Sequence, residues 1–245
     1  MLIHYYLYDM RYLYTSLRRW SLSLLTCSLL AGSLSAQTDN EVQPDRPDQS
    51  EGTSVLSPQR LQIEWGVGTS SGYHNMGLML RYGLVPDLEL RLEALLLRPY
   101  RGAVQVSDLT LSSKLALFSG DGWIPAMTLV GYLNYAPQEE ARRVTGDLTL
   151  ALEQELVSGL SLTCNIGSAE GMRRLSLTAE LGYNFTDRLS SFVECYGVFG
   201  PAEYGCDLGL SYAVTKDFLV DLSYGRTFFA SGAVNYASLG ATYRL

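Results

Sequence analysis

Apolar residues recur at every second position through most of this chain, and that period limits the possible folds more than any other feature of the sequence. Between Leu88 and Ala94, leucine and alanine alternate with Glu89, Arg91 and Glu93. A helix has a period of about 3.6 residues and would mix the two sets on every face, whereas an extended strand places them on opposite faces. The chain is therefore predicted to be all-β.

Twelve segments share this alternation, and most have the roughly ten residues that a tilted strand needs to cross a bilayer. The pattern is least regular in the fifth segment, where Pro125 interrupts it. The predicted strands cover residues 59–70, 73–84, 87–97, 105–118, 123–135, 144–156, 159–168, 173–185, 188–199, 203–214, 217–229 and 232–245.

The connections between these segments alternate in length. Every second one is a tight turn, such as Val85-Pro86-Asp87 or Thr215-Lys216-Asp217, and longer connections such as 98–104 and 136–143 lie between them. An even number of antiparallel strands, with short turns at one end and longer loops at the other, is typical of a transmembrane up-and-down β-barrel. The fold predicted for residues 59–245 is such a barrel, with about twelve strands.

Alternation alone also fits a soluble barrel of the lipocalin type, whose apolar face points inward. Two features favour the membrane. Leucines recur on one face of nearly every segment, and the opposite face combines glycine, serine and threonine with charges. Aromatic residues gather near segment ends, as the two membrane interfaces require; they include Tyr82, Phe118, Trp123, Tyr135, Phe185, Phe199, Tyr204, Tyr212, Phe218, Phe228 and Phe229.

The last segment is similar to the C-terminal signal of outer-membrane barrels. Gly240 is followed by Tyr243 and Leu245, which lie two positions apart on one face, although many such signals end in phenylalanine. As a free edge, this strand would invite aggregation, and a closed barrel removes that problem. The signal implies that the barrel-assembly machinery and outer-membrane lipid are partners, and that the chain resides in the outer membrane of a Gram-negative bacterium.

The N-terminal region has the features of a secretory signal peptide. Arg11, Arg18 and Arg19 precede an uncharged run at 20–30, and small residues follow up to Ala36. Residues 1–36 are therefore predicted to be the signal, with Met1 or Met10 as the start. The polar, proline-containing stretch 37–58 has no periodicity and is predicted to be an N-terminal periplasmic arm.

Charge and cysteine content exclude several classes of function. Of 18 basic and 25 acidic residues, the signal contains three arginines and one aspartate, so the mature chain has 15 and 24 and a net charge of −9. Nucleic-acid binding needs basic surfaces, so no such partner is expected. Cys164, Cys195 and Cys206 are an odd number and fall on the apolar face, so neither a disulfide framework nor a metal site is expected.

If the leucine faces contact lipid, the opposite faces enclose the lumen. The surplus of acids there cannot all be paired, so water is expected, and with it a preference for cations or neutral solutes over anions. A plugged, purely structural lumen is the alternative. The candidate lumen lining consists of eleven acids and three bases: Glu64, Arg81, Glu89, Arg91, Glu93, Asp108, Lys114, Asp147, Glu153, Glu155, Glu180, Glu194, Asp207 and Asp221.

Catalysis is not expected. His74 is the one histidine of the mature chain, and Ser70, Ser71 and Asn75 lie beside it in sequence. Neighbours in a loop rarely make the relay geometry of a hydrolase. The Gly66-Val67-Gly68 stretch lacks the spacing of a phosphate-binding loop, so no cofactor is predicted.

The stretch Asp45-Arg46-Pro47-Asp48 resembles the opening of a family of outer-membrane transporters named for a MetA pathway of phenol degradation. The resemblance covers nearly the whole mature chain. It implies a passive channel for small solutes, with aromatic or hydrophobic compounds as the first class to consider. The alternative is a structural or surface-adhesive barrel without transport, whose outer arginines contact polysaccharide: Arg98, Arg101, Arg142, Arg143, Arg173 and Arg174.

Overall fold

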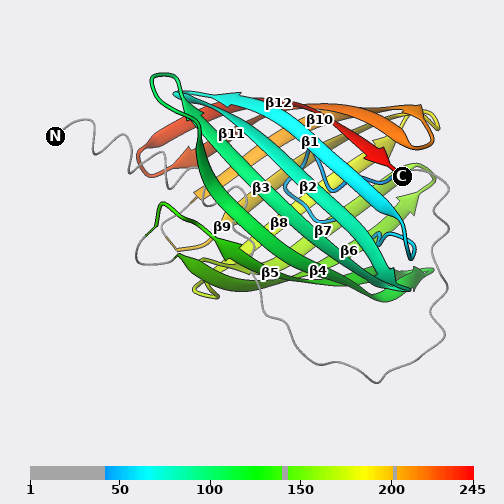
Figure 1. Ribbon diagram of the computed structural model, residues 1–245. Coiled ribbons are helices and arrows are strands. Elements are labelled where there is room, and N and C mark those ends of the chain that lie inside the picture. The colour runs from blue at the N-terminus through cyan, green and yellow to red at the C-terminus, as the bar shows by residue number, and fades with distance from the viewer. Residues whose placement is uncertain (1–41, 140–142, 201–202) are drawn as a thin grey trace.

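The computed structural model describes residues 42–139, 143–200 and 203–245, and these form one closed β-barrel (Figure 1). The predicted signal at 1–36 and the first residues of the predicted arm lie outside the described residues. The strands are β1 (Leu61–Ser70), β2 (Tyr73–Val85), β3 (Leu88–Pro99), β4 (Gln105–Asp121), β5 (Ile124–Tyr135), β6 (Val144–Val157), β7 (Leu160–Ala169), β8 (Arg174–Asn184), β9 (Leu189–Val198), β10 (Glu203–Thr215), β11 (Phe218–Phe229) and β12 (Gly232–Arg244).

Each strand pairs antiparallel with its neighbours in sequence, and β12 pairs with β1 to close the barrel. The closure ends with the Leu245 N–H, which donates to the Leu61 carbonyl oxygen at 2.8 Å. The predicted fold class and the twelve predicted strands are therefore confirmed. No helix among the described residues is long and apolar enough to cross a bilayer.

The outer face of the barrel is apolar. Leu92 and Leu208 expose 51% and 53% of their surface, and similar side chains cover the outward face of other strands. An apolar surface of this extent on a soluble protein would aggregate, whereas lipid covers it without cost. Near the tight-turn end, the ring of Phe218 lies 6.4 Å from those of Trp65 and Tyr243, as in an interfacial aromatic girdle.

The interior of the barrel is polar instead of apolar. Among the described residues, the largest side chains that are fully buried include Arg81, Arg91 and Lys114. The buried hydrophobic cluster that the described residues form, in contrast, consists of Tyr73 and Leu95, with Leu97 packed against them. Charges buried in this way need partners, because desolvating them alone is expensive. The partners come largely from the N-terminal part of the described chain.

Residues 42–58, hereafter the lumen segment, run inside the barrel, where Figure 1 shows them in blue. The segment enters beside the β10–β11 turn, where the Val42 N–H donates to the Lys216 carbonyl oxygen. It leaves at the same end, where the Gln59 N–H donates to the Gly83 carbonyl oxygen. Residues 37–58 are predicted from the sequence to form a periplasmic arm, but the described part of that stretch lies within the lumen.

Candidate functional site

The lumen segment contacts one wall of the barrel through Asp45. One Asp45 carboxylate oxygen lies 2.7 Å from Lys114 Nζ on β4, and the other lies 2.8 Å from Arg91 Nη1 on β3 and 3.2 Å from Arg81 Nη1 on β2. Burial alone would raise the pKa of Asp45, but these three cations outweigh it and hold the pKa well below its usual range. We call β2 to β4 with their three bases the basic wall.

Glu51 is a second carboxylate on the basic wall. Its two oxygens accept hydrogen bonds from Arg91 Nη1 at 2.6 Å and Nη2 at 2.9 Å, which is the bidentate arrangement of a strong charge-assisted pair. The Tyr132 hydroxyl donates to the same carboxylate at 2.6 Å. Burial opposes ionisation of Glu51, but Arg91 prevails and lowers its pKa.

Arg81 differs from the other two bases because it has acidic partners on the barrel strands themselves. Its guanidinium donates to Glu89 at 2.6 and 3.0 Å and to Glu64 at 2.9 Å. The same group donates to the Gln43 carbonyl oxygen at 3.0 Å. Arg81 therefore keeps two carboxylate partners that do not belong to the lumen segment.

Arg46 points away from the basic wall. Its guanidinium donates to the Asp221 carboxylate on β11 at 3.1 and 3.3 Å and to the Ser238 hydroxyl at 2.9 Å. A Cβ atom placed on Gly66 or Gly240 would lie 2.2 or 2.4 Å from this guanidinium. The two glycines, which pair across β1 and β12, therefore provide the space that Arg46 fills.

Further along the segment, backbone and hydroxyl groups bind the strands opposite the basic wall. The Gln49 N–H and the Ser50 hydroxyl donate to Glu194 on β9 at 2.7 and 2.5 Å. The Glu51 N–H donates to Asn165 on β7 at 2.6 Å, and Asn165 donates back to the Glu51 carbonyl oxygen. We call β8 to β11, with Glu180, Glu194, Asp207 and Asp221, the acidic wall.

The last part of the segment returns toward β1. The Thr53 hydroxyl donates to Glu153 on β6 at 2.6 Å, and the Leu56 N–H donates to Glu89 at 2.9 Å. The chain then crosses directly over Gly83, where an added Cβ atom would lie 2.1 Å from the Ser57 carbonyl oxygen. Polar bonds to strands around the barrel thus hold the segment.

The structure places most of the candidate lining residues inside the barrel, and their role along a solute path stays a prediction. Glu93, Glu153 and Glu180 are half-buried, and Glu155 is exposed at the tight-turn end, where it accepts from the Gly159 N–H. The remaining ten are buried: Glu64, Arg81, Glu89, Arg91, Asp108, Lys114, Asp147, Glu194, Asp207 and Asp221. Asp147 lies apart from the segment and accepts from Ser168 at 2.9 Å and from Gly171 at 3.2 Å.

The sequence singled out Asp45 and Arg46 only as part of a family-like motif, and it did not place them or Glu51 in the lumen. Asp45, Arg46 and Glu51 lie outside the alternating stretches, so the parity of the strands does not detect them. The sequence did offer one signal for these residues. The lumen segment carries charges of both signs, and the predicted lumen lining has more acids than bases. Tyr132 was missed too, although its parity matches that of Val130 and Thr128, which are buried.

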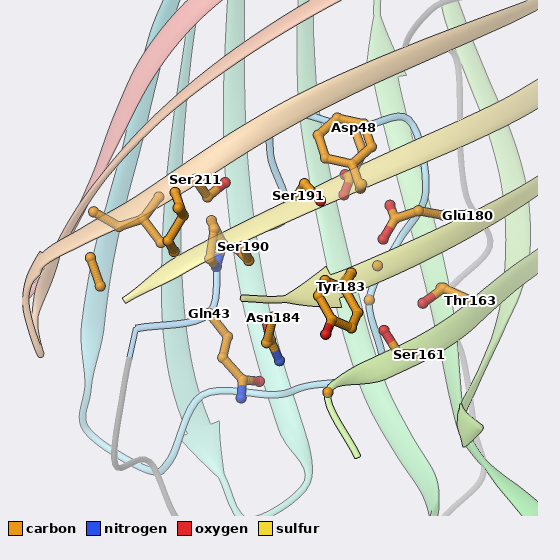
Figure 2. Close-up of a pocket in the computed structure, with 18 of the residues that line it drawn as sticks. Gln43, Asp48, Ser161, Thr163, Glu180, Tyr183, Asn184, Ser190, Ser191 and Ser211 are labelled. Atoms are coloured by element: carbon orange, nitrogen blue, oxygen red, sulfur yellow. The ribbon is translucent and has the colours of Figure 1, made fainter. Parts of the chain in front are cut away.

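A cavity of about 730 Å³ lies beside the segment at the tight-turn end, bordered by the β6–β7 and β8–β9 turns. Figure 2 shows hydroxyl and amide side chains from β7 to β10 around it, together with the carboxylates of Glu180 on β8 and of Asp48 on the lumen segment. Arg46, Pro47 and Asp48 also line a smaller cavity of about 70 Å³, which reaches Tyr73 and Tyr236. Residues 46–48 therefore lie between the two spaces.

The other residues that the sequence analysis considered lie away from the lumen. His74 is exposed on the outward face, and its ring centre is 4.9 Å from that of Tyr100. Cys195 and Cys206 are exposed free thiols opposite each other on β9 and β10, with their sulfurs 2.6 Å apart, and Cys164 is half-buried. No group of three or more His, Cys, Asp or Glu side chains within the described residues could hold a metal ion.

Solved structures with a similar fold are outer-membrane barrels. The KdgM porin in complex with disordered oligogalacturonate is 13% identical, with a TM-score of 0.61 over 74% of this chain and 98% of that one. An outer membrane channel from Pseudomonas putida F1 is 14% identical, with a TM-score of 0.56 over 84% and 100%. The outer membrane phospholipase A from Escherichia coli, as an active-site mutant, is 12% identical, with a TM-score of 0.52 over 77% and 91%.

These likenesses show the fold, and with the apolar outer face they place the barrel in an outer membrane. No curated protein is significantly similar to this chain in sequence. Residues 44–245 match the family described as "Putative MetA-pathway of phenol degradation". The match begins one residue before Asp45 and so includes both the lumen segment from Pro44 onward and the entire barrel. The chain therefore belongs to this family of the MetA pathway of phenol degradation.

Proposed function

We propose that this protein is a passive channel for small solutes in the outer membrane, and that the lumen segment closes it. The observation that carries the proposal is the cavity of about 730 Å³ inside a membrane barrel, which ends against residues 46–48. A solute that enters from the tight-turn end meets a polar vestibule and then the segment. Passage through the barrel therefore requires the segment to move.

The bonding of the segment supports such a movement. Most of its contacts are ion pairs and hydrogen bonds, and apolar packing contributes mainly through Val42 and Leu56. A buried ion pair gives little net stability relative to its hydrated parts, because desolvation offsets the attraction. Water that enters the lumen can replace these bonds, so displacing the segment costs less than removing an apolar plug of the same size.

The solute class is a separate part of the proposal. The family is named for a pathway of phenol degradation, so small aromatic or hydrophobic compounds are the first class to test. We infer transport without catalysis. This inference is supported by the place of His74, which lies on the outward face against Tyr100 and not in the cavity.

Single-channel recording of the refolded mature chain in planar bilayers tests the channel. The wild type should show rare openings, and Arg46→Gln should open more often because it loses its charge pairing with Asp221. Glu155→Gln is the matched control, since this exposed carboxylate does not contact the segment in the described structure and its replacement should leave the openings unchanged. If none of the three proteins shows channel openings, although each is shown to be folded, the proposal is contradicted.

A structural or surface-adhesive barrel is the second candidate, and the bonds between the lumen segment and several strands favour it. Arg98, Arg101, Arg143 and Arg173 are exposed at the loop end, where they could reach surface polysaccharide or lipid phosphate. Arg174 is instead half-buried and paired with Glu170 at 2.9 Å, and Arg142 lies outside the described residues. The absence of channel openings in the bilayer recordings would favour a structural or adhesive barrel.

A further inference from the structure

Arg91 and Lys114 are buried cations that depend on the lumen segment for their charge partners. Their exposed fractions are 1% and 0%. Among the described residues, the ion pairs of Arg91 are with Asp45 and Glu51, and those of Lys114 are with the same two carboxylates. When the segment leaves, both cations lose these partners, whereas Arg81 keeps Glu64 and Glu89.

The strands hold Arg91 in position without help from the segment. Arg91 Nε donates to the Ser112 hydroxyl at 3.0 Å, and the guanidinium lies 5.6 Å from the centre of the Tyr132 ring. The free edge of the guanidinium and the Tyr132 hydroxyl both point to the carboxylate of Glu51. An arginine fork beside a hydroxyl donor is a geometry that recognises carboxylates.

A second carboxylate position lies next to the first. Asp45 bridges Lys114 Nζ at 2.7 Å and Arg91 Nη1 at 2.8 Å, so Arg91 contacts both carboxylates of the segment at once. Two carboxylates at such short range would repel each other without the cations between them. The arrangement is therefore that of a receptor for two carboxylates, occupied by side chains of the same molecule.

We infer that Arg91, Lys114 and Tyr132 form a binding site for small organic dicarboxylates, and that Asp45 and Glu51 occupy it as an internal ligand when the barrel is closed. A solute with two carboxylates replaces both side chains and restores the charge balance of the basic wall. A neutral compound of the same shape cannot. This inference rests on the proposed channel and adds to it a solute class and a mode of opening.

Binding of dicarboxylates at the basic wall is the opposite of the preference for cations that the surplus of acids predicts. The acids in surplus lie largely on the acidic wall, across the lumen from Arg91 and Lys114, and Asp221 there is paired with Arg46. A count of charges over the whole interior averages two walls of opposite sign.

The solute must compete with Asp45 and Glu51, which are part of the same chain. Because such an internal ligand has an effective concentration of about a millimolar or more, the solute must also be present at millimolar concentration.

Hydrogen–deuterium exchange of the full mature chain in lipid vesicles tests the inference, with succinate as the dicarboxylate probe. The Gln49, Glu51 and Leu56 amides donate to side chains of the barrel wall and should be protected. Millimolar succinate should speed their exchange by about threefold or more, because it shifts the segment toward its released state. Succinamide, the neutral diamide, and sodium chloride at equal ionic strength should have no such effect.

Two variants connect the effect to the site. Tyr132→Phe keeps the ring and removes the hydroxyl donor, and Lys114→Gln removes one cation, so both should weaken the response to succinate. Tyr196→Phe is the matched control, because its hydroxyl bonds Thr227 and Tyr236 on the other side of the lumen. Its response should equal that of the wild type.

The outcomes separate this inference from the proposed channel. The carboxylate site is supported if succinate speeds the exchange while succinamide and salt do not, and if this acceleration is smaller in Tyr132→Phe and Lys114→Gln. This holds even when the bilayer recordings show no channel openings. In that case the channel proposal fails and the site stands. Equal exchange in succinate, succinamide and salt overturns the inference, including when recordings show an open channel. An equal response in Tyr132→Phe, Lys114→Gln and wild type overturns it as well.

Discussion

Gly66 and Gly240 leave the space in which the Arg46 guanidinium lies against Asp221. Neither glycine is needed there for an unusual backbone conformation, because both lie within regular strands. Their missing side chains allow a long cationic side chain to lie flat against the wall. Single residues on the strands are thus fitted to single residues of the lumen segment.

Asp48 is a residue of the segment whose charge opposes docking. Burial, with the nearby Glu180, Glu194 and Asp207, raises its pKa well above the usual 3.8. A raised pKa means that the docked segment retains this proton at pH values at which a solvated aspartate has lost it. Docking is therefore favoured at low pH and weakens as pH rises from 3.8 through the shifted pKa.

Asp48→Asn removes this titration and should stabilise the docked state at alkaline pH. We expect the free energy of unfolding to rise by about 1 kcal/mol at about pH 8, and by less at about pH 5, where the raised pKa leaves a larger share of the wild-type side chain protonated. Urea titration of the wild type and the variant in lipid vesicles at the two pH values measures this change in the free energy of unfolding. Asp187→Asn, at the exposed β8–β9 turn, is the control. A gain for Asp48→Asn that is the same at both pH values would show that its charge is not the cause.

At the scale of elements, the strands were predictable and the lumen segment was not. A strand with lipid on one side and a polar lumen on the other keeps its parity throughout, because a slip of one residue would exchange the two faces. The segment has no such period, and its partners, such as Glu194 and Asp221, lie far from it in sequence. The charges that attract it were visible on the strands, but the way they pair depends on the closed barrel.

The register of β9 against β10 can be tested through Cys195 and Cys206. The two residues are paired directly, and their thiols face each other on the outer surface. Paired Cα atoms in an antiparallel sheet are about 4.5–5.5 Å apart, which is within the range of a disulfide. A mild oxidant such as copper phenanthroline should therefore remove one hydrogen from each thiol and link them.

Intact mass and peptide mapping measure the product. The expected result is a loss of two hydrogens, a linked peptide that contains Cys195 and Cys206, and a free Cys164. A register shifted by one residue would place the two thiols on opposite faces, and no link would form. A link between Cys164 and either of the others would contradict the strand order instead.

At the scale of the whole molecule, the barrel has two walls of opposite charge, and the lumen segment bridges them. Asp45 and Glu51 face the basic wall, whereas Arg46 between them pairs with the acidic wall. The net charge of the mature chain, which was clear from the sequence, says nothing of this division. It follows that the docked segment and the barrel walls are coupled through these charges, because a charge removed from either partner leaves the other unpaired.

A double-mutant cycle of Arg46 and Asp221 tests this coupling. Arg46→Gln leaves a buried carboxylate without its cation, and Asp221→Asn leaves a buried cation without its carboxylate, so each should lower the free energy of unfolding by about 1–3 kcal/mol. The double variant leaves no unpaired charge, so its loss should be smaller than the sum of the two by about 1 kcal/mol or more. Urea titration of the four proteins in lipid vesicles gives the coupling. Losses that simply add would mean that Arg46 and Asp221 are not coupled, and that the segment docks without this pair.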